Sequence, residues 1–264
     1  MNMRVHAAGQ TDVGCVRKGN EDNFLIDDEL GLYVVADGLG GHAAGEVASQ
    51  IVVERIGQFI SQTVEQDRTW PLDYDVNIPY DGNRLKAALM LSDQAIVEDI
   101  RSNPERESMG STVVACLVHG ARVTLAHVGD SRAYLMDSKG MRQVTQDHSW
   151  VAEQVANGIL TPEEARKHPF RNVITQALGN GGELDVAVQE LQVQELERLL
   201  LCSDGLSGMV QDADIWEIVQ KASTLQRAAH DLVARARANG GEDNITVIII
   251  GFEPDNDSQP AEKP

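Results

Sequence analysis

The chain has 264 residues, 42% of them hydrophobic, and its 41 acidic residues outnumber 22 basic ones to give a net charge of −19. This length is enough to bury one large core or two small ones. A surface of this sign repels nucleic acid and anionic membranes, and no basic run offsets it, so the composition argues against both kinds of partner.

The cysteines and the start of the chain indicate in which cellular compartment the protein resides. Cys15, Cys116 and Cys202 form no CxxC pair, and the last two lie inside apolar runs, which is typical of buried thiols in a reducing compartment. The first ten residues do not resemble a signal peptide, and no apolar run approaches the roughly 20 residues of a membrane span. We therefore expect a soluble, cytoplasmic protein.

In the first part of the chain, short apolar runs alternate with turns, and two segments with helical periodicity follow. Residues 61–83, which contain Trp70-Pro71, read as a polar surface excursion between two amphipathic helices. In order, we expect strands over 4–14, 23–27 and 32–36, helices over 44–60 and 84–101, and strands over 111–118, 122–128 and 132–137.

The second part begins with a polar, proline-containing region. Thr161-Pro162-Glu163-Glu164 within it is a good helix start. Residues 253–264 are polar with little to bury, so we expect a disordered tail. In order, we expect a short helix near 150–157, strands near 184–191 and 197–203, helices over 212–222 and 224–238, and an apolar, central strand over 245–252.

The order of these elements predicts the fold class. Strands mostly connect as hairpins and helices come as consecutive pairs, whereas a parallel sheet would need alternating strands and helices. We therefore expect an α+β protein with a central antiparallel β-sandwich, flanked on both faces by pairs of helices.

One hairpin makes a testable prediction about charge. If Glu29 and Leu30 form a two-residue loop, the pairing continues until Asp22 faces Asp37. Directly opposed residues lie only about 4.5–5.5 Å apart. Two like charges at that distance are destabilising unless a cation lies between them.

Acidic residues recur where apolar runs begin or end. Asp37-Gly38-Leu39-x-Gly41 and Asp204-Gly205-Leu206-x-Gly208 each follow an apolar run. Any single Asp-Gly pair is more often a turn, but a repeated frame favours a carboxylate site for Mg²⁺ or Mn²⁺. Part of the acidic excess would then form a cation site. The candidate acids are Asp22, Asp37, Asp130, Asp204 and Asp243.

Arg17 stands a few residues before Asp22, and a guanidinium can clamp a phosphate with two hydrogen bonds. A solvated surface arginine is the equal alternative from the sequence alone.

Together these motifs resemble those of the PPM-type (type 2C-like) metal-dependent protein serine/threonine phosphatases in their compact bacterial form. They occur in the family's order between residues 4 and 252, and jointly they are highly specific. The matching motifs are Arg17-x-x-Asn20-Glu21-Asp22-Asn23, Val35-Ala36-Asp37-Gly38-Leu39-Gly40-Gly41, Gly110-Ser111-Thr112, Gly129-Asp130-Ser131-Arg132, Ser203-Asp204-Gly205-Leu206 and Asp243-Asn244-Ile245-Thr246.

The resemblance implies a single catalytic domain over residues 1–252, with a variable flap at about 147–185 beside the cleft. It implies that Asp37 bridges two metal ions, that Gly38 offers one of them its carbonyl, and that Asp204 and Asp243 bind the first. Asp22 would act on the second through water, and Asp130 with Asp204 would match a third position. Arg17 would hold the substrate phosphate, with Glu21 and Asn244 supporting the site.

The implied reaction is hydrolysis of phosphoserine and phosphothreonine by a metal-bridging hydroxide. It implies phosphoprotein substrates and a cognate serine/threonine kinase, and we expect a monomer. One departure concerns the proton donor, because Leu39 stands where the eukaryotic branch has a histidine. His42 should not inherit that role; His148 and His168 in the flap, or a metal-bound water, remain candidates.

Two rival functions remain open at this point. A small-molecule phosphoesterase would use the same metals, and a binding module without activity would not need them. All five acids and Arg17 are intact, which disfavours the second.

Overall fold

The computed structural model describes residues 3–41, 43–64 and 74–254, and within them two five-stranded sheets form the centre of the fold. Every pairing between these strands is antiparallel, which confirms the predicted α+β sandwich. One sheet has the order β2 (Asp22–Asp27), β3 (Leu32–Leu39), β4 (Gly110–His119), β5 (Arg122–Val128) and β8 (Ala187–Gln192). The other has the order β1 (Met3–Asp12), β10 (Ile245–Pro254), β9 (Arg198–Cys202), β6 (Arg132–Met136) and β7 (Met141–Gln143).

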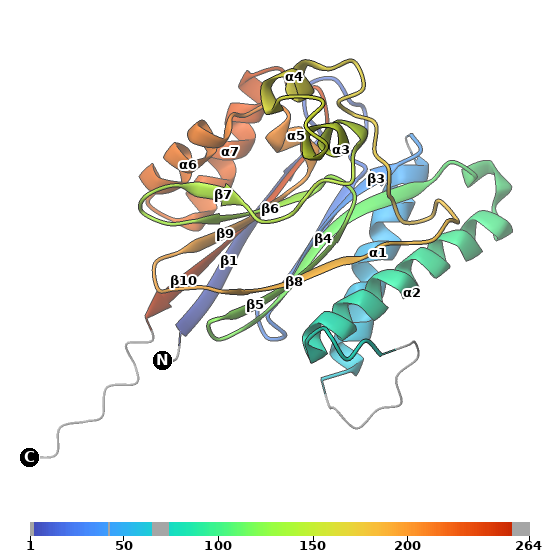
Figure 1. Cartoon of the computed structure of the whole chain (residues 1–264), viewed down its shortest axis with the longest axis horizontal. Coiled ribbons are helices and arrows are strands. Elements are labelled where there is room, and N and C mark those ends of the chain that lie inside the picture. Colours follow the sequence, from blue (N-terminus) through green and yellow to red (C-terminus); the bar gives the residue numbers. More distant parts are fainter. Residues whose placement is uncertain (1–2, 42, 65–73, 255–264) are drawn as a thin grey trace, which may run out of the picture.

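Helix pairs cover the outer face of each sheet (Figure 1). Helices α1 (Ala43–Gln62) and α2 (Tyr80–Ser102) pack on the sheet that contains β3 and β4. Helices α6 (Asp212–Lys221) and α7 (Leu225–Ala238) pack on the sheet that contains β10. The shorter elements are η1 (Pro104–Arg106), α3 (Trp150–Ala156), α4 (Pro162–Lys167) and α5 (Asp204–Ser207).

Strand alternation divides the core into three layers. In β10, Ile248 and Ile250 point between the sheets, whereas Val247 and Ile249 join the layer under α7. All four side chains are completely buried. The prediction that this strand is interior and covered on both faces is therefore confirmed, since it pairs with β1 on one side and β9 on the other.

The short elements η1, β7 and α5 were not predicted. Strand β7 has three residues, and α5 is a single turn that begins at Asp204, where the sequence showed only an Asp-Gly turn. Trp70-Pro71 and the tail from residue 255 onward lie outside the described residues. Within the described residues, no helix combines the length and apolarity needed to cross a membrane.

Candidate metal centre

The five predicted aspartates lie at strand ends that meet at one end of the sandwich. Asp22 begins β2 and faces Asp37 near the end of β3, which confirms the predicted register. Asp130 lies in the turn between β5 and β6, Asp204 directly follows β9 through Ser203, and Asp243 stands shortly before β10. Because β2 and β3 belong to one sheet and β9 and β10 to the other, the cluster spans both sheets.

A hydrogen-bond chain joins the two sheets beside these acids. The Ser203 Oγ donates to Asp22 Oδ2 at 2.8 Å and accepts from the Thr246 backbone N–H at 3.0 Å. Both hydroxyl-bearing residues are fully buried. Sequence reasoning gave neither of them a role, although Ser203 precedes Asp204 and Thr246 closes the Asp243-Asn244-Ile245-Thr246 motif.

Asn244 fastens the loop that carries Arg17. Its Oδ1 accepts from the Glu21 backbone N–H at 2.7 Å, and its Nδ2 donates to the carbonyls of Val13 and Gly19 at 3.0 and 2.9 Å. The amide thus uses its acceptor and both donors. This geometry suits the supporting role that the resemblance implies.

Two glycines allow backbones to approach closely where the acids converge. A Cβ on Gly38 would overlap the carbonyl oxygen of Gly45 in the first turn of α1. A Cβ on Gly205 would overlap the carbonyl oxygen of Asn244. Because neither position has room for a side chain, the glycines after Asp37 and Asp204 let the sheets and helices close around the cluster.

Burial and mutual repulsion raise the pKa values of the carboxyl groups of Asp22, Asp37, Asp130 and Asp204. Burial raises the pKa of Asp22 to about 7, and the charges of Asp204 and Asp243 add to the effect. Burial and the charge of Asp204 raise the pKa of Asp130 to about 7, and burial and the charge of Asp243 raise that of Asp204 to about 6. The pKa of Asp37 rises well above its usual range for the same reasons, with Asp22 the foremost charge.

The donor chemistry fits hard divalent cations. Asp22 Oδ1 and Asp204 Oδ1 are buried and lack a hydrogen-bond partner within the described chain. Unsatisfied buried carboxylate oxygens are costly, and a cation that coordinates them would remove both this cost and the repulsion. Oxygen ligands of this kind are preferred by Mg²⁺ and Mn²⁺.

The acidic side chains are not already arranged as a set of metal ligands. Among residues 3–41, 43–64 and 74–254, no three His, Cys, Asp or Glu side chains are already placed so that they could hold one. Asp243 is engaged elsewhere, since the Arg17 guanidinium donates to its Oδ2 at 2.7 Å. The predicted roles of Asp37, Asp204 and Asp243 in binding one ion therefore stay predictions.

The negative charge of the cluster affects the pKa of Arg17. Partial burial works to lower the pKa of its guanidinium, but the hydrogen bond and charge of Asp243, with the charges of Glu21 and Asp37, outweigh burial and raise it. Arg17 is thus a firmly charged group at the rim of the cluster, where it can meet an anion.

The proton-donor candidates lie in the flap, and the structure tests neither. His148 Nδ1 accepts from the Gly129 backbone N–H at 3.3 Å, and its ring stacks on His127 at 5.0 Å. Burial lowers the pKa of His148, so its neutral form dominates at neutral pH. The ring of His168 packs against Trp150 at 4.9 Å. His42 lies outside the described residues.

The predicted flap segment, residues 147–185, is held at its start by a largely buried ion pair and along its length by more exposed ones. Arg132 in β6 donates to both carboxylate oxygens of Asp147, at the start of this segment. Farther along, Arg166 pairs with Asp212, and Arg171 pairs with Glu242, next to Asp243. Helices α3 and α4 accordingly lie at the same end of the sandwich as α5 (Figure 1).

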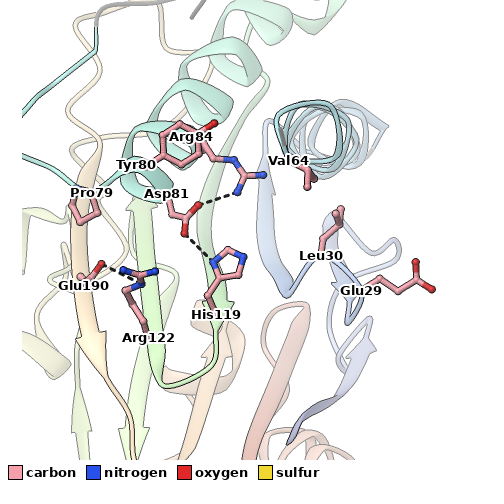
Figure 2. Close-up of a pocket in the computed structure, with 10 residues that line it drawn as sticks. All are labelled: Glu29, Leu30, Val64, Pro79, Tyr80, Asp81, Arg84, His119, Arg122 and Glu190. Carbon is pink, nitrogen blue, oxygen red and sulfur yellow. Dashed lines mark hydrogen bonds and ion pairs between the residues drawn. The ribbon is translucent and has the colours of Figure 1, made fainter. Parts of the chain in front are cut away.

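A separate hollow of about 490 Å³ lies at the other end of the β2–β3 hairpin (Figure 2). Asp81 there pairs with both Arg84 and His119, and the Arg84 guanidinium also donates to the Ile60 carbonyl and the Thr63 hydroxyl. These groups satisfy one another, and none of the predicted site residues lines the hollow.

Known proteins resemble this chain over most of its length. The profile of the family described as Protein phosphatase 2C matches residues 17–240. The serine/threonine phosphatase stp of Listeria innocua is 37% identical over 254 residues, which cover 93% of this chain and 95% of that protein. The serine/threonine protein phosphatase PstP of Mycobacterium tuberculosis is 38% identical over 242 residues, which cover 92% of this chain but 44% of PstP.

Solved structures show the same fold. A crystal structure of Mycobacterium tuberculosis PstP/Ppp has a TM-score of 0.82 and 37% identity, with 95% of this chain and 99% of that chain covered. A structure of the PstP catalytic domain in complex with two manganese ions has a TM-score of 0.81 and 35% identity, with 96% and 100% covered.

The raised pKa values predict how the stability of the metal-free protein depends on pH. The folded protein holds protons on Asp22, Asp130 and Asp204 up to pH 6–7, whereas the unfolded chain releases them near 3.8. Their contribution to stability is therefore complete below the unfolded pKa and disappears as pH rises through the folded values. In the presence of chelator, we expect the Tm measured by circular dichroism to fall between pH 5 and 8.

The variant Asp22→Asn should show a flatter Tm–pH curve, since it removes one of the titrating groups. A wild-type Tm that stays constant or rises over this range would contradict the prediction.

The close approach at Gly205 gives a second prediction. Gly205→Ala should lower the free energy of unfolding by about 1–3 kcal/mol, because the new methyl group must displace the Asn244 backbone. Urea titration measures this change. Gly140→Ala is the matched control, since a Cβ there meets nothing within 4 Å; equal effects of the two substitutions would refute the packing argument.

Proposed function

The chain belongs to the protein phosphatase 2C family and is a serine/threonine protein phosphatase, and we propose that the carboxylate cluster is its metal-dependent catalytic centre. The observation that carries this proposal is the set of buried, mutually repelling aspartates with unsatisfied oxygens at Asp22 and Asp204. Such an arrangement is unfavourable on its own and becomes favourable with cations bound.

Each acid has a proposed place around the ions. Asp37 would help to hold two of them, and the carbonyl of Gly38, a position with no room for a side chain, would help to hold one. Asp204 and Asp243 would hold the first ion, and Asp22 would act on the second through water. Asp130 with Asp204 would hold a third. We propose Mn²⁺ or Mg²⁺ for all of these positions; a relative is described with two manganese ions.

Bound divalent cations would lower the pKa of water, so that hydroxide is available near neutral pH, and would offset the charge of the phosphoryl group. The residues of the chain position the reactants. Arg17, charged and half exposed, binds the substrate phosphate, and Asn244 holds the loop that presents it. Because the reaction is an in-line displacement at phosphorus, no cysteine or serine nucleophile is needed. His148, His168 or a water supplies the proton to the departing seryl or threonyl oxygen.

Further proposals concern the setting of the enzyme. We propose that residues 1–252 form one catalytic domain, supported by the profile match over 17–240, and that the chain acts as a monomer, since all three core layers close within it. Its substrates are phosphoproteins, and we propose a cognate serine/threonine kinase. The unpaired, buried Cys116 and Cys202 support a cytoplasmic location.

The catalytic proposal predicts the effect of removing single ligands. Asp37→Asn and Asp204→Asn should each lower Mn²⁺-dependent hydrolysis of p-nitrophenyl phosphate by on the order of 10²-fold or more, since each loses a charge that the reaction needs. Neither should lower the Tm in chelator, because each relieves repulsion. Asp231→Asn, on the outer helix α7, is the control. Full activity in both site variants would refute the metal assignment.

An experiment can also distinguish a protein phosphatase from a small-molecule phosphoesterase. Binding contacts beyond the phosphate should raise kcat/KM for phosphoserine and phosphothreonine peptides at least about tenfold above that for nucleotides. Steady-state phosphate release under one Mn²⁺ concentration measures both. Higher kcat/KM values for free nucleotides would favour the phosphoesterase instead.

A further inference from the structure

The contact between Arg17 and Asp243 joins a proposed phosphate-binding group to a proposed metal ligand. Their side chains are 46% and 36% exposed, and the guanidinium nitrogen lies 2.7 Å from Asp243 Oδ2. The two residues are 226 positions apart in the sequence. A charge-assisted hydrogen bond of this length is among the stronger polar contacts.

Hydrogen bonds on both sides hold this pair in place, one between backbone groups and one from a side-chain amide. The Cys15 N–H donates to the Gly241 carbonyl at 2.7 Å, two residues from each member of the pair. The Asn244 amide fastens Gly19 from the other side at 2.9 Å. The Arg17 loop and the Asp243 loop therefore form one unit, and the contact follows from the fold rather than from a chance meeting of surface side chains.

The carboxylate of Asp243 has both oxygens engaged. Oδ1 accepts from the Asn244 backbone N–H at 2.8 Å, and Oδ2 accepts from Arg17. A divalent cation bound to this carboxylate would repel the guanidinium held at Oδ2 and so weaken its contact with Asp243. Arg17 thus places a positive charge on Asp243 beside the cluster.

We propose that Arg17 and a divalent cation compete for Asp243, so that metal binding releases the arginine to the substrate phosphate. This inference rests on the proposed function of the cluster as a metal centre. Arg17 then couples metal binding to phosphate binding. Without the ion, Arg17 is bound to the Asp243 carboxylate; with the ion, Arg17 is free to bind phosphate.

The coupling is reciprocal by thermodynamic necessity. A phosphate that binds Arg17 removes it from Asp243 and so raises the affinity for the ion by the same factor by which the ion raises the affinity for phosphate. One substitution should therefore have effects of opposite sign: Arg17→Ala should tighten metal binding and weaken phosphate binding.

General electrostatics could imitate the first of these effects, because removing any nearby positive charge favours a cation. Lys18 provides the matched control, since it is the next residue on the same loop, is exposed, and makes no ion pair within the described part of the chain. Arg235, 44% exposed and paired with Asp214, controls for the loss of an equally exposed arginine ion pair.

The experiment measures free Mn²⁺ by electron paramagnetic resonance during titration into metal-free protein, which requires no turnover. Without phosphate, Arg17→Ala should bind its tightest Mn²⁺ about threefold to tenfold more strongly than wild type. Lys18→Ala and Arg235→Ala should stay within about twofold of wild type. Added orthophosphate should tighten Mn²⁺ binding more in wild type than in Arg17→Ala.

Three outcomes overturn the inference. These are an Arg17→Ala affinity for Mn²⁺ equal to or below that of wild type, a Lys18→Ala gain as large as that of Arg17→Ala, or an orthophosphate effect that is the same in both proteins. Arg17→Gln, which keeps hydrogen-bond donors without the charge, guards against a local rearrangement and should behave like Arg17→Ala. If the wild-type protein binds no Mn²⁺, the proposed function itself is refuted. If it binds Mn²⁺ and hydrolyses substrate normally but shows one of the three outcomes above, only the proposed competition between Arg17 and the ion is refuted.

Discussion

The structure depends on a repulsion that its own strand register imposes. Asp22 and Asp37 face each other across a ladder whose pairing is fixed by the β2–β3 turn, so neither acid can move away without shifting the register of buried residues such as Val34 and Val35. Asp204 and Asp243 then approach from the other sheet. The sandwich thus concentrates negative charge where its two halves meet, and cations there would join the halves as well as serve the reaction.

Uncharged hydroxyl groups also stabilise this end of the sandwich. Ser203 binds Asp22 across the two sheets, and Thr246 binds Ser203 and, through its own hydroxyl, Thr11 at 2.7 Å within the sheet that contains β10. The first contact joins the two sheets, the others stabilise one of them, and none adds charge. Because the hydroxyl groups carry no charge, the negative charge of the carboxylates would be neutralised by bound ions. The hydroxyl-bearing residues therefore build the site, whereas the aspartates would bind its ions.

Sequence patterns predicted the parts of the protein that local rules control. The turn at Glu29 and Leu30 fixed the facing of Asp22 and Asp37, and the apolar run of β10 indicated an interior strand. What local rules could not predict are contacts between segments far apart in the chain: the pair of Arg17 with Asp243, and the role of Ser203. Strand β7 and helix α5 were missed because three or four residues are too short to show a period.

The way the flap leaves and rejoins the sandwich has a consequence for how such enzymes diversify. The backbone N–H of Trp150 donates to the Val173 carbonyl, and that of Thr175 donates to the His148 carbonyl, both at 2.8 Å. The intervening segment therefore starts and ends at hydrogen-bonded neighbours, like a stem that closes a loop. Because closure entropy grows only slowly with loop length, residues can be inserted or lost beyond this stem at little cost to the sandwich. This segment can therefore vary in length and sequence while the carboxylate cluster keeps its geometry.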